Sequence, residues 1–235
     1  MSRFPRYAIY YAPEADSALA WFGASMLGYD AASASDVDHP ADLIGAVADW
    51  HDLTSDPRNY GFHATLKAPF ALNDTADETQ LIEACAGFAG TAREIPVITP
   101  VVQAISGFIA IVPSEPSPTL AALAQECVEA FDGFRAPLTS ADRARRKPDR
   151  LSARQVAQLD RWGYPYVMDD FRFHMTLTGR LPDTRQPEII AVLQQRFEEL
   201  RLKTLAIDRL ALFKQALAGS RFRIIGDFAL SPRPK

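Results

Sequence analysis

The sequence contains the pattern His-x-Thr-Leu twice, at His63 and His174, 111 positions apart. Each copy lies in a segment that alternates like a β-strand, residues 60–70 and residues 171–181. Successive side chains of a strand point to opposite faces, so His and the Thr two positions later share one face, roughly 7 Å apart. Both segments therefore have one apolar face for a core and one polar face that carries an imidazole and a hydroxyl.

A single His-x-Thr pair on a strand is ordinary, but its repetition is not. The chain has four histidines, and two of them are followed by Thr at the second position. In both copies Phe precedes the His and Leu follows the Thr. A duplicated imidazole–hydroxyl unit can bind one phosphate from two sides and supply both an acid and a base. The sequence thus predicts His63 and His174 as an acid–base pair, with Thr65 and Thr176 as donors to phosphoryl oxygens.

With these motifs the chain resembles the 2H phosphoesterase superfamily, which is named for two His-x-Thr/Ser-x motifs. The nearest likeness is to a bacterial branch, DUF1045-like, that is often associated with phosphonate-utilisation operons. Beyond the two motif segments, the likeness is carried by Arg6–Pro13, by Leu212–Ala216 and by Arg221–Ile225. In the family the four motif positions form the catalytic set, and all four are filled here.

The resemblance implies an α+β, LigT-like fold with two pseudo-duplicated lobes, each with an antiparallel sheet, on either side of a central cleft. Strand–helix alternation alone would favour a parallel α/β sheet, so the antiparallel arrangement is an implication of the family. We expect one domain over residues 1–235, with lobes at about 1–105 and 106–235 and with a possible exchange of strands between them.

The pattern of apolar residues predicts where the main elements lie. Helices are expected at residues 15–27, 77–88, 119–131 and 187–200, and strands at 6–12, 95–112, 205–213 and 221–230. Residues 138–164 are charged and partly helical in pattern. Cys85 and Cys127 are expected to be buried free thiols, because their spacing fits neither a zinc site nor a disulfide framework.

Several further residues are candidates for substrate binding. Lys67 shares the predicted face of His63 and Thr65, while Thr178 and Arg180 extend the face of His174. The N-terminal strand lines the cleft in relatives, so Tyr10 is a candidate for stacking on a sugar or base. Weaker candidates from the C-terminal strands are Lys214 and Arg223. The basic run 141–150 is typical of a solvated helix end; alternatively, it caps the cleft and attracts an anionic substrate.

No cofactor is indicated by the sequence. It contains no Walker-type phosphate loop, no dinucleotide fingerprint and no metal-binding His spacing, although Asp169 and Asp170 could be recruited by a metal. His39 and His51 are expected at the surface. The N-terminus lacks the apolar run of a signal peptide and no segment is apolar enough to span a membrane, so we expect a cytoplasmic protein without a membrane partner.

These observations favour a metal-independent phosphoesterase that opens a small, ribose- or nucleotide-derived cyclic phosphodiester, with a possible role in phosphonate metabolism. One alternative is the processing of RNA ends that carry a 2′,3′-cyclic phosphate, which the net charge of −4 disfavours. A second alternative is a non-catalytic module that binds a cyclic phosphate. The sequence leaves open the natural substrate, the oligomeric state and which histidine is the acid.

Overall fold

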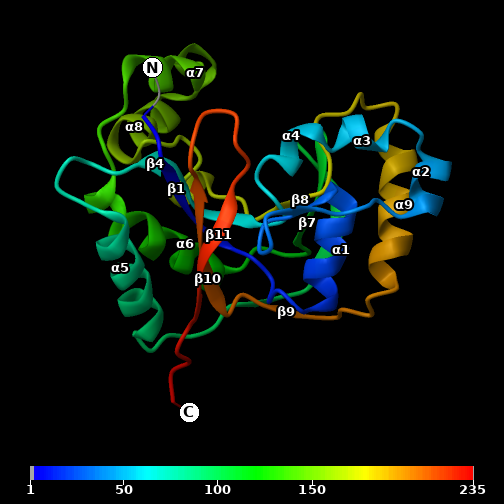
Figure 1. The fold of residues 1–235 in the computed structure, drawn as a ribbon, viewed down its shortest axis with the longest axis horizontal. Helices are drawn as coiled ribbons and strands as arrows, with labels where there is room; N and C mark the ends of the chain where they lie inside the picture. Colours follow the sequence, from blue (N-terminus) through cyan, green and yellow to red (C-terminus); the bar gives the residue numbers. More distant parts are fainter. Residues whose placement is uncertain (1–2, 235) are drawn as a thin grey trace.

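A seven-stranded antiparallel sheet runs through the centre of the protein, whose computed structural model describes residues 3–234 (Figure 1). The order of its strands is β11-β10-β1-β4-β8-β7-β6. Their bounds are Arg6–Tyr11 for β1, Ala64–Ala71 for β4, Pro100–Ile105 for β6, Phe108–Pro113 for β7, Met175–Thr176 for β8, Arg209–Gln215 for β10 and Arg223–Ala229 for β11. Two further pairs are β2 (Tyr29–Asp30) with β3 (Ser35–Asp36) and β5 (Val97–Ile98) with β9 (Leu205–Ala206).

The two motif strands, β4 and β8, are neighbours in the middle of this sheet. Strands β1, β10 and β11 continue the sheet beyond β4, and β7 and β6 continue it beyond β8. The sheet is therefore antiparallel in both halves, which confirms the α+β class. The C-terminal strands β10 and β11 lie beside the N-terminal strand β1, so the two halves of the sheet do not follow the order of the sequence.

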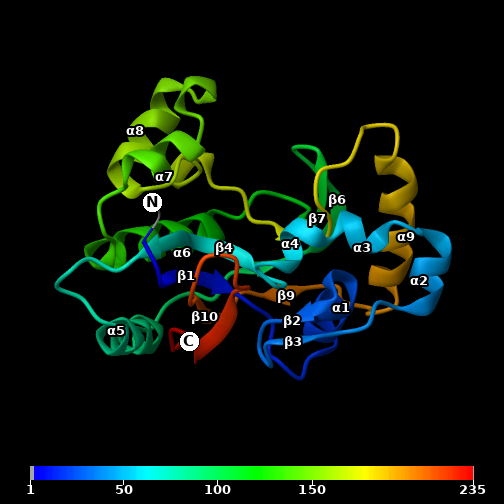
Figure 2. The same ribbon diagram turned by 45° about the horizontal axis from the view of Figure 1, so that its top comes forward.

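Helices cover one side of each half of the sheet (Figure 2). In one half, α6 packs on β4, and α5 packs on β10 and β11. In the other half, α9 packs on β6 and β7, and α1 meets α9 where Phe22 contacts Phe197. The bounds of these helices are Ala18–Leu27 for α1, Glu78–Gly90 for α5, Pro118–Ala130 for α6 and Gln186–Glu198 for α9.

Local sequence explains where these helices begin and end. The Ser17 hydroxyl accepts a hydrogen bond from the amide of Ala20 at the start of α1, and Gly28 ends that helix in the left-handed conformation that glycine adopts without strain. Asp77 and Gln80 form a reciprocal capping box at the start of α5. The four predicted long helices are thus present with small shifts at their ends.

Shorter helices occupy the two segments that link the motif strands to the rest of the chain. The segment before β4 holds α2 (Ala41–Ala46), α3 (Trp50–Leu53) and α4 (Ser55–Arg58). The segment before β8 holds α7 (Ser140–Arg145) and α8 (Ala153–Trp162), with single 3-10 turns at Asp132–Phe134, Pro148–Arg150 and Met168–Asp170. In Figure 2, α7 and α8 stand together above the β1–β4 half of the sheet.

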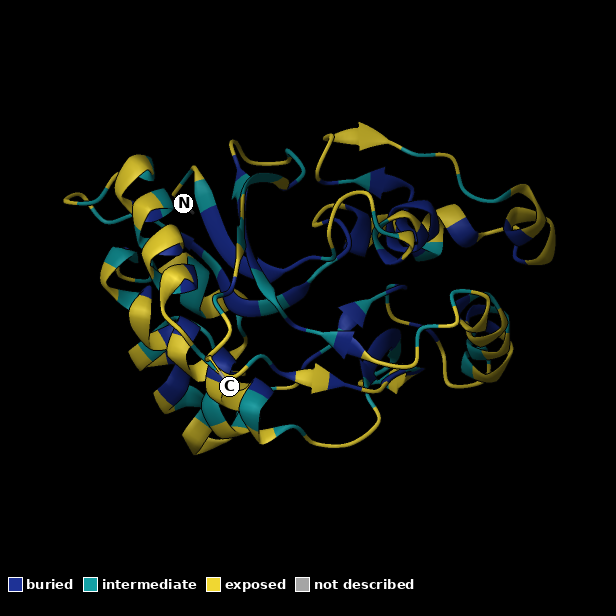
Figure 3. Cartoon of the chain, turned by 90° about the horizontal axis from the view of Figure 1, so that it is seen from below, coloured by how far each residue is buried: buried dark blue, intermediate teal, exposed yellow. Residues whose placement is uncertain are grey.

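The strands of the central sheet are largely buried, while the long helices have exposed outer faces (Figure 3). The sheet separates two apolar clusters. The large core lies on the side of the long helices and includes Ile9, Ala64 and Met175; it also contains Cys85 and Cys127, which are free and buried as predicted. The smaller cluster lies on the other side and includes Tyr10, Phe213 and Phe222. Within residues 3–234, no helix is both long and apolar enough to cross a membrane.

Candidate functional site

The four motif residues meet where β4 and β8 pair. Ala64 pairs with Met175 in antiparallel register, and both side chains are fully buried in the large core. The residues on either side of this pair therefore point to the opposite face of the sheet. The antiparallel register places Thr176 across from His63, and His174 across from Thr65, at a cross-strand Cβ distance of roughly 5 Å. The two His-Thr units thus form a compact set with approximate two-fold symmetry.

Both imidazoles are held in the same way by the backbone. The Nδ1 atom of His63 lies 2.8 Å from the carbonyl oxygen of Gly61, and the Nδ1 atom of His174 lies 2.7 Å from that of Arg172. A carbonyl oxygen only accepts, so each Nδ1 carries a hydrogen and donates it. In the neutral ring the other nitrogen, Nε2, is then a bare acceptor. The Thr65 hydroxyl oxygen lies 3.5 Å from Nε2 of His63, at the limit of a hydrogen bond.

His63 is enclosed by aromatic side chains. Tyr10 stacks on its imidazole, with ring centroids 3.8 Å apart and planes 18° from parallel, and Phe213 and Tyr60 lie further out at 5.8 and 6.1 Å. This burial lowers the pKa of His63 to about 4; the carbonyl of Gly61 raises it in part, and a charge on the nearby His174 lowers it further. The imidazole of His63 is therefore neutral at physiological pH.

His174 borders a cavity of about 270 Å³ on the same face of the sheet. Burial also lowers the pKa of His174, and the carbonyl of Arg172 opposes that change. Thr65 lines the same cavity, together with Phe108, whose ring centroid lies 5.4 Å from that of His174. A cavity of this size, with a bare imidazole nitrogen and a hydroxyl at its wall, suits a small phosphorylated molecule.

Of the further residues predicted to bind substrate, besides the four motif residues, only Arg180 lies at this cavity. Its side chain is exposed, and its guanidinium lies close to Gly107, which stands between Ser106 and Phe108 of the cavity wall. Tyr10 reaches the site in a different role from the one predicted. Its ring is 1% exposed and packs on His63, so it supports the imidazole and is not an open platform for a sugar or base.

Lys67 does not share the face of His63 and Thr65, so this prediction is wrong. Tyr10 pairs with Thr65 but Ile9 pairs with Lys67, which leaves one extra residue in β4 between them. Such a bulge breaks the alternation of faces. The Lys67 ammonium is buried and donates to the carbonyl of Val128 at the end of α6 and to the carboxylate of Asp132. Burial lowers the pKa of Lys67 to about 8, although the charge of Asp132 opposes this.

Thr178, Lys214 and Arg223 also lie away from the cavity. Strand β8 ends at Thr176, and the fully buried Thr178 hydroxyl accepts from the amide of Ile109 and donates to the carbonyl of Gly179. Lys214 forms an ion pair with Glu78 of α5, on the helix side of the sheet. Arg223 is exposed on the edge strand β11, opposite Lys214.

Sequence analysis missed the aromatic residues of the cavity wall. Besides Phe108, these are Tyr164, Tyr166 and Phe171, which lie in the segment between α8 and β8. Tyr166 is 47% exposed, which is unusual for a large aromatic residue. The Tyr-Pro-Tyr sequence ahead of the second motif was the available signal, and it is weak without the structure.

The other two histidines surround Arg58, away from the cavity. The buried Arg58 guanidinium contacts Nε2 of His51 at 2.8 Å and donates to the carbonyl of Leu27 at the end of α1. His39 contacts the carbonyl of Ser25 through Nδ1 and is only half-buried, while His51 is exposed. Throughout residues 3–234, no group of three or more His, Cys, Asp or Glu side chains is placed to hold a metal ion.

A comparison with protein-family models identifies the family. Residues 65–223 match the family described as "Protein of unknown function (DUF1045)". The chain belongs to this family. The branch predicted from the two motif segments together with Arg6–Pro13, Leu212–Ala216 and Arg221–Ile225 is thereby confirmed.

Curated relatives extend the likeness over nearly the whole chain. It is 36% identical over 228 residues to a protein of Janthinobacterium sp. (strain Marseille) named "Ribose 1,5-bisphosphate phosphokinase PhnN", with 92% of this chain and 49% of the relative covered. A protein of the same name from Laribacter hongkongensis (strain HLHK9) is 34% identical over 223 residues, which cover 93% of this chain and 50% of that protein. The chain thus spans about half the length of the curated relatives it matches.

Solved structures with a similar course of the chain include LigT of E. coli. Its complex with 3′-AMP matches with a TM-score of 0.38 at 13% identity and covers 97% of this chain and 98% of LigT. Its complex with NADP+ matches with a TM-score of 0.39 at 15% identity, with 98% and 99% covered.

Proposed function

We propose that this protein is a metal-independent phosphoesterase that hydrolyses a small cyclic phosphodiester by acid–base catalysis with two histidines. The observation that carries the proposal is the cross-strand arrangement of two His-Thr units, each with its Nδ1 tied to a carbonyl and its Nε2 bare. Ring opening needs a base for water, an acid for the leaving oxygen and donors for the phosphoryl oxygens. The four residues supply one group for each of these needs.

The surroundings of the two histidines favour one assignment of roles. His63, stacked on Tyr10 and neutral, takes the proton of the attacking water at Nε2. The water oxygen forms a bond to phosphorus as the ring P–O bond breaks. His174, at the cavity wall, enters protonated and gives its Nε2 proton to the leaving alkoxide. The negative charge of the bound phosphodiester stabilises the His174 cation, which offsets the effect of burial in the empty site.

The phosphoryl oxygens then need donors as negative charge develops on them. The hydroxyl of Thr65 lies at the cavity wall, where Arg180 provides a cation. Thr176, which does not line the cavity, is the second proposed donor and lies across from His63 on the neighbouring strand. Each acid or base contributes about 10²–10⁴-fold to the rate, and donors at the oxygens add several kcal/mol. Together, these contributions to the rate are large enough for catalysis without a metal ion.

A ribose-derived substrate is the most economical choice. The cavity of about 270 Å³ suits a sugar, and the two curated relatives carry a name that refers to a ribose phosphate. That name describes a phosphokinase, but the present chain contains no Gly-x-x-x-x-Gly-Lys-Ser/Thr loop for ATP. We therefore propose hydrolysis for this chain and not ATP-dependent phosphoryl transfer.

The decisive experiment is ³¹P NMR of the purified protein with a panel of five-membered cyclic phosphates in the presence of EDTA. The wild type should open at least one ring, and His63→Ala and His174→Ala should not. Turnover that is absent in EDTA and restored by a divalent metal would overturn the metal-independent mechanism. Binding without turnover under both conditions would favour the module that only binds a cyclic phosphate, and selective turnover of cyclic-phosphate RNA ends would favour RNA processing.

A further inference from the structure

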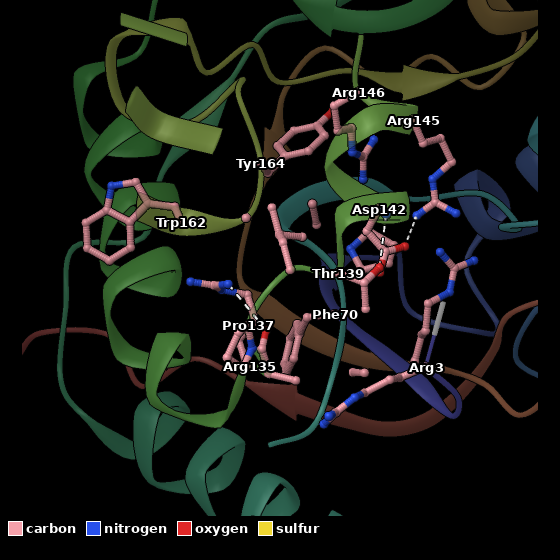
Figure 4. Close-up of a pocket in the computed structure, with 17 residues that line it drawn as sticks. Arg3, Phe70, Arg135, Pro137, Thr139, Asp142, Arg145, Arg146, Trp162 and Tyr164 are labelled. Atoms are coloured by element: carbon pink, nitrogen blue, oxygen red, sulfur yellow. Dashed lines mark hydrogen bonds and ion pairs between the residues drawn. The ribbon is translucent and has the colours of Figure 1, made fainter. Parts of the chain in front are cut away.

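A second pocket, lined by several arginines, shares part of its wall with the cavity; Figure 4 shows the side chains that line it. It has a volume of about 40 Å³ and lies between the second half of β4 and the α7–α8 segment. Its lining, which we call the arginine pocket, has one carboxylate, Asp142, and five arginines: Arg3, Arg6, Arg135, Arg145 and Arg146. The chain as a whole has a net charge of −4, so this positive surplus runs against its overall charge.

Three of the five arginines of the arginine pocket form ion pairs: Arg3 with Asp74, Arg135 with Asp132 and Arg145 with Asp142. Arg6 and Arg146 contact neutral side chains instead. Arg6 is half-buried, and its guanidinium donates to the neutral side-chain amide of Gln215. Burial lowers the pKa of Arg6, and repulsion from Arg145 adds to this effect while Asp142 opposes it. Arg146 lies over the ring of Tyr164, 4.8 Å from its centroid. Guanidinium groups gathered in this way match the charge and the oxygen geometry of a phosphate.

The arginine pocket and the cavity of His174 share part of their walls. Ala68 and Tyr164 line both. Ala68 follows Thr65 by three positions along β4, which corresponds to about 10 Å of strand. A sugar of five carbons could therefore place one phosphate between the histidines and another among the arginines. A pocket that holds about three waters is large enough for a single phosphoryl group but not for a base or a second sugar.

We propose that the arginine pocket binds a phosphomonoester at the end of the substrate remote from the cyclic ester. This inference rests on the proposed function and narrows its substrate class to sugar cyclic phosphates that carry a second, terminal phosphate. It also gives the basic run 141–150 a role, because Arg145 and Arg146 belong to it. The terminal phosphate provides binding energy away from the reacting bond, which enzymes use to orient a substrate.

A binding experiment tests the pocket without relying on turnover. Ribose 5-phosphate, which has a terminal phosphate and no cyclic ester, is titrated by calorimetry into the His63→Ala/His174→Ala protein, with ribose as the reference ligand. Ribose 5-phosphate should bind and ribose should not. Arg146→Gln or Arg6→Gln, added to this background, should weaken binding about 10–100-fold through loss of a charge-assisted contact. Arg143→Gln is the matched control, because Arg143 lies in α7 three positions before Arg146 but pairs with Asp160 outside the pocket.

Turnover then separates this inference from the proposed function. Wild type should open a ribose cyclic phosphate with a 5-phosphate about 100-fold or more efficiently, in kcat/KM, than the same ring with a free 5-hydroxyl, and Arg146→Gln should reduce that ratio about 10-fold or more. Equal turnover of both substrates would overturn the inference and leave the proposed function intact. Ribose 5-phosphate binding that depends on Arg146, without opening of either ring, would support the pocket and overturn the phosphodiesterase. Equal affinity of Arg146→Gln and Arg143→Gln for ribose 5-phosphate would overturn the assignment of the arginine pocket as the phosphate site.

Discussion

The ring of Tyr10 lies 3.8 Å from the imidazole of His63 and nearly parallel to it, and it is almost completely buried there. Tyr10 is next to Thr65 in the β1–β4 pairing, so one strand supports the imidazole that the adjacent strand carries. The stack keeps water from one face of the imidazole and fixes the plane of the ring, while the carbonyl of Gly61 fixes its rotation. Together these contacts aim Nε2 of His63 before any substrate arrives.

Tyr10→Leu should therefore change the chemistry of His63 and not only the packing around it. Without the ring, water reaches the imidazole, and the pKa of His63 should rise from about 4 toward its usual value. The less constrained ring should lower kcat about 10–100-fold. The pKa is measured by NMR titration of the imidazole nitrogens. Tyr10→Phe is the control, since it keeps the stack and should resemble wild type. An unchanged His63 pKa in Tyr10→Leu would show that the stack has only a packing role.

The low pKa of His63 also predicts how stability depends on pH. Between about pH 6.5 and pH 4 the unfolded chain binds a proton at this position while the folded chain does not, so the free energy of unfolding falls as the pH falls. Lowering the pH from 7 to 4.5 should cost up to about 3 kcal/mol through His63, at about 1.4 kcal/mol for each pH unit within this window. Urea unfolding of wild type and His63→Gln at both pH values measures the difference. A pH dependence that is identical in the two proteins would contradict it.

The sequence predicted the four motif residues, their common face and the long helices, but not every neighbour of the site. The face of Lys67 was predicted wrongly, because the alternation of side chains holds only while a strand is regular and the bulge in β4 could not be seen in the sequence. The prediction for Thr178 was wrong for a similar reason. Strand β8 is only Met175–Thr176, and the backbone amides of both Leu177 and Thr178 then donate to the carbonyl of Ile109. The position of β10 and β11 beside β1 depends on pairing over a long sequence separation, which periodicity does not encode.

The structure makes Lys67 a stabilising residue, in contrast to the sequence-based expectation. Its ammonium is buried and, together with Arg135, compensates the carboxylate of Asp132. Lys67→Met keeps the length of the side chain but removes the charge, and should lower the free energy of unfolding by about 1–3 kcal/mol while turnover stays within about threefold of wild type. Chemical unfolding and steady-state kinetics measure the two quantities. Turnover that falls strongly while stability is unchanged would instead place Lys67 at the substrate.

Arg180 is the one cation, among the substrate-binding residues predicted from the sequence, that lines the cavity of His174. Its guanidinium should contact the phosphodiester, so Arg180→Gln should lower kcat/KM about 10–100-fold through loss of a charge-assisted hydrogen bond. Arg185→Gln is a matched control, because this nearby arginine pairs with Asp49 and does not line the cavity. The wild-type KM should also rise with ionic strength, and this rise should be smaller in Arg180→Gln, since a charge contact with an open cavity is partly screened by salt. Equal kcat/KM values for Arg180→Gln and Arg185→Gln would show that Arg180 does not contact the substrate. The phosphoryl oxygens would then be bound by Thr65 and Thr176.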